Sequence, residues 1–119
     1  MICHITLRDA WEAAQAGGEF RSPDFDAIGF IHCSTPEQVI LVANAFFRGQ
    51  SDLVMLVIDP AKLKSQVRWE PPHSTERVPG FMHGSVFPHV YGPINLDAVV
   101  RVEQLVLSDS GTFKMPRPA

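Results

Sequence analysis

The pattern of apolar and polar positions along the chain predicts a protein of mixed helices and strands. Short apolar or alternating runs are typical of strands, and six of them stand between turn-forming residues: 2–5, 28–33, 53–58, 67–70, 98–107 and 112–113. The run 53–58 is apolar at every position and is followed by Asp59 and Pro60. We therefore expect it to be a central strand that is buried on both faces.

Two segments with helical spacing predict the main helices. The first helix is expected after Thr6, which resembles an N-cap, and it stops at Gly17. The second is expected between Thr35 and Gly49, because positions 35, 36 and 38 hold the threonine, proline and glutamine of a capping box. Apolar residues then recur at helical spacing: Val39, Val42, Ala43 and Phe46.

Two of the apolar segments carry a histidine and a second polar residue two positions later. Residues two apart in an extended chain share a face. His32 and Ser34 therefore project together, as do His89 and Tyr91. If the two faces are adjacent, we expect them to form a ligand-binding site.

Two further residues are candidates for this site. His4 lies on the first expected strand and is either a ligand contact or a core histidine bonded to backbone. Glu70 stands just before two prolines, and it is either catalytic or paired with Arg68 or Arg101. The loop 71–85, which holds several prolines and glycines with two histidines, is long enough to form a lid over a site.

Composition and charge narrow the classes of function. The 119 residues are 45% apolar and 19% charged, which predicts one globular domain over 1–119. A formal net charge of −3 does not favour binding to duplex DNA. The sequence has no apolar run long enough to span a membrane, and we expect no leader. We expect a cytoplasmic protein with a small-molecule ligand, and the sequence leaves any protein partner unknown.

The spacing of the histidines and cysteines predicts neither a metal site nor a disulfide. Three histidines brought together can hold zinc, but the chain has no HxxxH or CxxC spacing, so we expect no metal site. Cys3 and Cys33 sit in apolar contexts and are expected to be buried thiols rather than a disulfide.

Several segments together resemble the bacterial DUF952 family, over nearly the whole chain: 3–6, Trp11 with Ala14, 29–35 followed by Gln38, Trp69 with Glu70, and 87–93. That family looks like a compact relative of the ADP-ribosyltransferase fold. The resemblance implies an α+β domain in which small split antiparallel sheets, with two main helices, surround a cleft for NAD.

The resemblance also implies roles for residues on the first strands. His4, Ile5 and Thr6 are similar to the His-Gly-Thr of transferases that begin with histidine, which implies that His4 bonds the ribose and helps to fix the nicotinamide amide. The segment 30–35 is loosely similar to a Phe-x-Ser-Thr-Ser element, which implies Ser34 or His32 at the cleft floor. Ile5 replaces the usual glycine of the first motif.

We therefore expect one cleft that binds NAD or a related nucleotide or phosphorylated ligand. The expected catalytic residues, for ADP-ribosyl or NAD-dependent phosphate transfer, are Glu70, His89 and His32. The expected cofactor-binding residues are His4, Thr6, Ser34 and Tyr91. The alternative is a catalytically inert ligand-sensing or protein-interaction module on the same fold.

Overall fold

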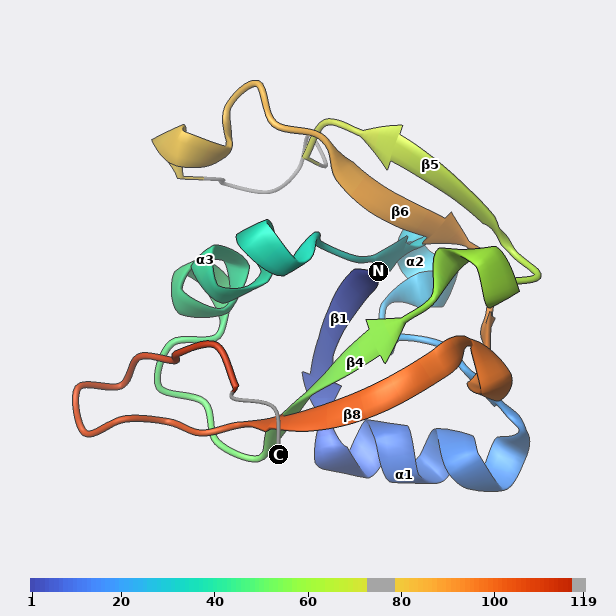
Figure 1. Ribbon diagram of the computed structural model, residues 1–119, viewed down its shortest axis with the longest axis horizontal. Helices are drawn as coiled ribbons and strands as arrows, with labels where there is room; N and C mark the ends of the chain where they lie inside the picture. The colour runs from blue at the N-terminus through green and yellow to red at the C-terminus, as the bar shows by residue number, and fades with distance from the viewer. Residues whose placement is uncertain (73–78, 117–119) are drawn as a thin grey trace.

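Three small antiparallel sheets and three α-helices make up the part of the chain that the computed structural model describes, residues 1–72 and 79–116 (Figure 1). The helices are α1 (Arg8–Gly17), α2 (Phe25–Ile28) and α3 (Pro36–Phe46). Short 3-10 turns cover Pro60–Lys62, Gly80–Met82 and Leu96–Ala98. Within these residues, no helix is long and apolar enough to cross a membrane.

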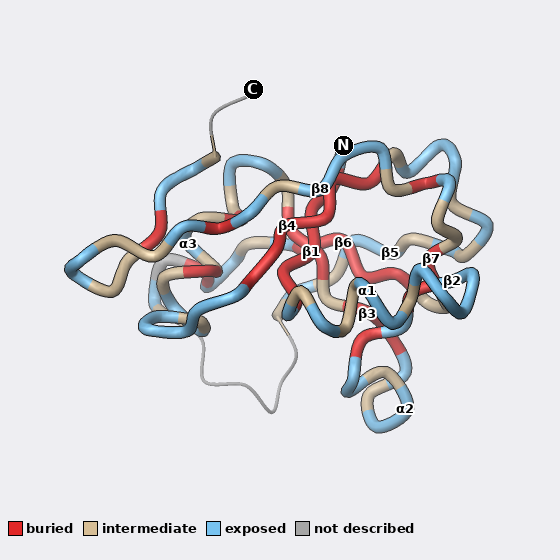
Figure 2. Tube along the Cα trace, turned by 90° about the horizontal axis from the view of Figure 1, so that it is seen from below, coloured by how far each residue is buried: buried red, intermediate tan, exposed pale blue. Residues whose placement is uncertain are grey.

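The first sheet has the order β1-β4-β8, formed by Ile2–Leu7, Leu53–Ile58 and Val99–Leu105. β4 is its middle strand and is buried at every position, so the predicted central strand is confirmed. Alternate β4 side chains enter two separate cores because successive residues of a strand face opposite ways. Partly buried residues of α1 pack against one core, and α3 contributes to the other. Figure 1 shows the positions of the two helices relative to the sheet, and β4 is buried in Figure 2.

The second sheet has the order β3-β6-β5, formed by Ile31–His32, Phe87–Tyr91 and Gln66–Glu70. A two-stranded pair of β2 (Glu19–Phe20) and β7 (Ile94–Asn95), which the apolar pattern did not predict, completes the sheets. β3 also approaches the first sheet through an isolated bridge between Cys3 and Ser34. The bridge brings the strand that carries His4 beside the strand that carries His32.

The first helix begins one residue later than the N-cap prediction requires. Thr6 is a buried residue of β1 paired with Val54, and Leu7 occupies the N-cap without a side-chain hydrogen bond. The N-cap prediction at Thr6 is therefore wrong, because a β-branched residue extends the buried strand. The predicted stop is confirmed, since Gly18 follows the helix in the left-handed conformation with φ 88°.

The capping box at the start of α3 is confirmed in both directions. The backbone N–H of Gln38 donates to Thr35 Oγ1 at 3.2 Å, and the backbone N–H of Thr35 donates to Gln38 Oε1 at 3.0 Å. The helix ends at Phe46, before the expected stop at Gly49. Gly49 instead takes φ 81° in the following turn, where its N–H donates to the Gly111 carbonyl.

Three strand predictions need their bounds corrected. The expected strand over 28–33 is wrong in its first half: Ile28 ends the single turn of α2, and Gly29 with φ 86° redirects the chain into the two-residue β3. The expected strand over 98–107 is β8, Val99–Leu105. The strand expected at 112–113 forms one bridge, from Phe113 to Leu107.

The cysteine prediction is confirmed. Cys3 and Cys33 are buried free thiols. Burial raises the pKa of Cys3 to about 11, and it also raises the pKa of Cys33. Both thiols therefore stay protonated at neutral pH and are poor nucleophiles.

Candidate functional site

His4 is held in the middle of the fold by the chain of β3. Its imidazole is buried, packs against Phe20 with ring centroids 5.3 Å apart, and bonds through Nδ1 to the backbone oxygen of His32 at 2.5 Å. A carbonyl oxygen can only accept a hydrogen bond. His4 therefore carries its proton on Nδ1, and Nε2 is left as a hydrogen-bond acceptor.

The charge state of His4 follows from its burial. Loss of solvation lowers the pKa of His4 from 6.5 to about 4, although the bond to the His32 carbonyl favours the protonated form. At neutral pH the side chain is thus an uncharged, oriented imidazole. Such a group suits recognition of a hydroxyl or an amide N–H better than recognition of a phosphate.

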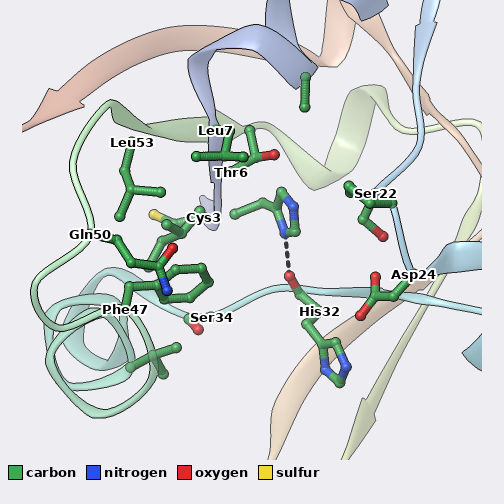
Figure 3. Close-up of a pocket in the computed structure, with 15 residues that line it drawn as sticks. Cys3, Thr6, Leu7, Ser22, Asp24, His32, Ser34, Phe47, Gln50 and Leu53 are labelled. Carbon is green, nitrogen blue, oxygen red and sulfur yellow. Dashed lines mark hydrogen bonds between the residues drawn. The ribbon is translucent and has the colours of Figure 1, made fainter.

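A pocket of about 400 Å³ lies beside His4 (Figure 3). This volume falls within the range of small-molecule sites. Polar side chains from several elements are among its lining: His4, Thr6, Ser22, Asp24, Ser34 and Gln50. The lining residues described include no lysine or arginine, so the Asp24 carboxylate is the formal charge that this pocket presents at neutral pH.

Ser22 is a wall residue that the sequence did not single out. Its side chain is buried, and its hydroxyl has no hydrogen-bond partner among the described residues. A buried hydroxyl without a partner costs free energy. A ligand or water that bonds it inside the pocket would offset that cost.

His32 takes part in two different environments. Its backbone oxygen faces the His4 pocket, while its ring points away from the pocket, as Figure 3 shows. On the second sheet His32 is directly paired with His89, and the two rings are nearly perpendicular with centroids 5.5 Å apart. Phe30 packs against both rings and lies parallel to His89 at 4.2 Å.

Glu70 joins the two residues of β6 that the sequence paired on one face. Its Oε1 accepts a hydrogen bond from His89 Nδ1 at 2.9 Å and another from the Tyr91 hydroxyl at 2.5 Å. The His89 side chain is 3% exposed and the Glu70 side chain 33% exposed. Arg68 covers the Tyr91 ring, with its guanidinium carbon 4.5 Å from the ring centroid.

These hydrogen bonds shift the pKa values of Glu70 and Tyr91 in opposite directions. The pKa of Glu70 is lowered, first by the Tyr91 hydroxyl and then by His89, because both donors stabilise the carboxylate. The pKa of Tyr91 is raised by the same bond, since the phenolate would lose it and would face the carboxylate. The His89 imidazole, which donates from Nδ1, keeps Nε2 as the nitrogen able to accept a proton.

The structure divides the predicted site residues into two adjoining groups. His4, Thr6 and Ser34 line the pocket together with His32, whose ring lies outside it. Glu70, His89 and Tyr91 are not lining residues of this pocket: they meet the His32 ring on the second sheet. We call these two groups the His4 pocket and the His89 cluster.

The structure shows which side chains Glu70 contacts, but it does not test the predicted lid. Glu70 bonds His89 and Tyr91, while Arg101 pairs with Glu103 at 2.6 Å. A catalytic role for Glu70 stays a prediction. The lid predicted over 71–85 stays a prediction, because residues 73–78 within it lie outside the described residues.

Some residues of the two groups were missed in the sequence. Phe30 could have been found, because it stands two positions before His32 and therefore shares its face. Ser22 and Asp24 come from an irregular stretch and carry no periodic signal. Across residues 1–72 and 79–116, no three histidine, cysteine or acidic side chains gather as a metal site would require.

Comparisons with known proteins show the family of the chain and give no activity for it. No curated protein matches the chain. The crystal structure of protein CC0527 from Caulobacter crescentus is 35% identical, with a TM-score of 0.80 over 95% of this chain and 92% of that chain. A double mutant of CC0527 gives 34% identity and a TM-score of 0.79 over the same shares. The solution structure of CC0527 gives 36% and 0.71 over 93% of this chain and 89% of that chain. A family model described as "Protein of unknown function (DUF952)" matches residues 5–102. The chain therefore belongs to the DUF952 family.

Proposed function

We propose that the His4 pocket binds the nicotinamide ribosyl part of NAD or of a related nucleotide, on a fold that is a compact relative of the ADP-ribosyltransferases. The observation that carries the proposal is the fixed, uncharged imidazole of His4 at the wall of a pocket of about 400 Å³. Its Nε2 is an acceptor for a ribose hydroxyl or for the carboxamide N–H of nicotinamide. Thr6 and Ser34 supply hydroxyls on the same wall.

The charge of the pocket decides which part of the nucleotide enters it. A phosphate in this pocket would be repelled by the Asp24 carboxylate. The described lining residues include no lysine or arginine that could neutralise the phosphate charge. The nicotinamide ring of NAD carries a positive charge, which Asp24 complements. The nicotinamide riboside therefore enters the pocket, and the phosphates stay outside it.

The His89 cluster supplies the chemistry in this proposal. It adjoins the pocket through His32, and it contains the carboxylate of Glu70 and the imidazole of His89 at hydrogen-bond distance. The His89 and His32 rings lie outside the pocket, so the acceptor of the ADP-ribosyl group would reach them from the side of the His89 cluster. There His89 and His32 are the imidazoles available for proton transfer, and Glu70, which also bonds Tyr91, orients His89. NAD-dependent removal of a phosphate is the second candidate reaction, with His32 and His89, whose ring centroids are 5.5 Å apart, as the imidazoles available to it.

An inert module is the competing function for the same pocket. In that case Glu70 is a structural acceptor for His89 and Tyr91, and ligand binding has no chemical consequence. An assay that measures nicotinamide release from NAD by chromatography distinguishes the enzyme from the inert module. Turnover that Glu70→Gln and His89→Asn each reduce supports the enzyme, and binding without turnover supports the module.

Binding is tested by thermal shift with nicotinamide riboside, NAD and ADP-ribose, because a ligand of the native state raises the midpoint. Nicotinamide riboside and NAD are expected to raise it more than ADP-ribose, which lacks nicotinamide. Asp24→Lys is expected to abolish the shift with nicotinamide riboside. Asp26→Lys is the matched control, since Asp26 is an exposed residue of α2 outside the pocket lining. No shift with any ligand, or equal shifts in both variants, would refute the proposal.

A further inference from the structure

β8 is an edge strand with an exposed side. It pairs with β4, and no other described strand pairs with it. Figure 1 shows β8, in orange, on the outer side of β4. The backbone N–H and C=O groups on the free side of such a strand are a template for another strand.

The sequence of β8 does little to block that pairing. Its seven residues, VVRVEQL, contain no proline or glycine, and they include valines, which favour strands. Val100 and Val102 are 44% and 39% exposed. From Arg101 to Leu105, β8 pairs in continuous register with β4, so Val102 and Gln104 share one face while Arg101 and Glu103 share the other. Val100 lies at a register shift between Val99 and Arg101.

Arg101 and Glu103 pair with each other within one chain at 2.6 Å, and they are also placed to pair across a two-fold axis with a second copy of the strand. A two-fold axis perpendicular to the sheet gives an antiparallel pair in which one residue lies opposite its own copy. With Val102 on the axis, each Arg101 lies opposite the other chain's Glu103. With Arg101 or Glu103 on the axis, two like charges face each other, which destabilises a cross-strand pair.

We propose that this protein forms a two-fold symmetric dimer in which β8 of one chain pairs with β8 of a second copy, with Val102 opposite Val102. The paired strands form one sheet of six strands in the order β1-β4-β8-β8-β4-β1. Two Arg101 to Glu103 pairs flank the central valines on one face. The proposal is independent of any ligand in the His4 pocket.

Charge exchange at the strand tests the register. Sedimentation equilibrium at low salt is expected to give a dimer for the wild type. Arg101→Glu and Glu103→Arg each place like charges across the axis and are expected to weaken the dimer about tenfold or more. The double variant Arg101→Glu/Glu103→Arg restores opposite charges and is expected to restore the dimer. Circular dichroism of each variant confirms that the chain is folded.

Cysteine cross-linking provides a second, independent measurement. Opposed residues of an antiparallel pair have Cα atoms about 4.5 to 5.5 Å apart, within the reach of a disulfide. Val102→Cys is expected to form a covalent dimer on mild oxidation. Val100→Cys is the matched control, because position 100 does not lie opposite its own copy in this register. A monomeric wild type, a double variant no more dimeric than the single ones, or equal cross-linking at both positions would overturn the proposal.

Discussion

Replacing His4 with glutamine is expected to remove a pH dependence from the stability of the protein. Glutamine keeps an N–H that can donate to the His32 carbonyl, but it does not titrate. In the wild type, burial lowers the pKa of His4 from 6.5 to about 4. Between these two pH values the unfolded chain therefore binds a proton at His4 that the folded chain does not bind.

The sign and size of the effect follow from this difference. Stability rises with pH wherever the unfolded state binds more protons. The contribution of His4 to the free energy of unfolding is fully present above pH 6.5 and is lost as the pH falls toward about 4. At about 1.4 kcal/mol per pH unit, the full loss is about 3 kcal/mol.

Urea unfolding at pH 7.5, 6.5, 5.5 and 4.5, followed by tryptophan fluorescence, measures the free energy of unfolding. The difference between wild type and His4→Gln isolates the histidine because other titrating groups are common to both proteins. We expect this difference to change by about 2.5 kcal/mol across the series, in favour of the variant at low pH, because pH 4.5 is still above the folded pKa. A difference between wild type and His4→Gln that is constant with pH would refute the burial argument.

Three further changes test local features of the structure. Thr35→Ala removes the side-chain half of the capping box and should lower the free energy of unfolding by about 1 kcal/mol in urea unfolding. Glu70→Gln should lower the pKa of Tyr91, which absorbance at alkaline pH reports directly because the chain has one tyrosine. Gly92→Ala should lower the thermal midpoint, since the new Cβ would lie 2.4 Å from Ser65 Oγ at a residue with φ 150°.

Conservative variants are the controls for these changes. Thr35→Ser keeps the hydroxyl acceptor and should restore most of the stability, and an equal loss in both variants would contradict the capping argument. Gly80→Ala adds a Cβ that meets no atom within 4 Å, so it should change the thermal midpoint less than Gly92→Ala does. An unchanged alkaline titration of Tyr91 in Glu70→Gln would contradict the bond between these two side chains.

Elements that depend on local signals could be predicted from the sequence. The capping box at Thr35 and the continuous apolar run of β4 each contain the information that forms them. The segment at 28–33 shows the limit of such signals. Its apolar residues suit a strand, but Gly29 allows a left-handed turn that ends α2 and shortens the strand to two residues.

The candidate site was predictable in composition and not in arrangement. Alternation on one strand correctly put His89 and Tyr91 on one face, where both reach Glu70. Whether His4, His32 and His89 lie in one cleft or in two adjoining groups could not be decided in this way. It depends on the bridge between Cys3 and Ser34, which joins two sheets across a long sequence separation.

His32 explains why the two groups of residues adjoin without merging. Its carbonyl oxygen is a property of the backbone, so it fixes the tautomer of His4 whatever side chain stands at position 32. Its ring is directed to the other side of β3, where it meets His89 and Phe30. One residue of a two-residue strand thus orients an acceptor for the pocket and contributes an imidazole to the cluster. Under the proposed function, ligand recognition in the His4 pocket and proton exchange in the His89 cluster can therefore be altered by separate substitutions, although a single strand positions both.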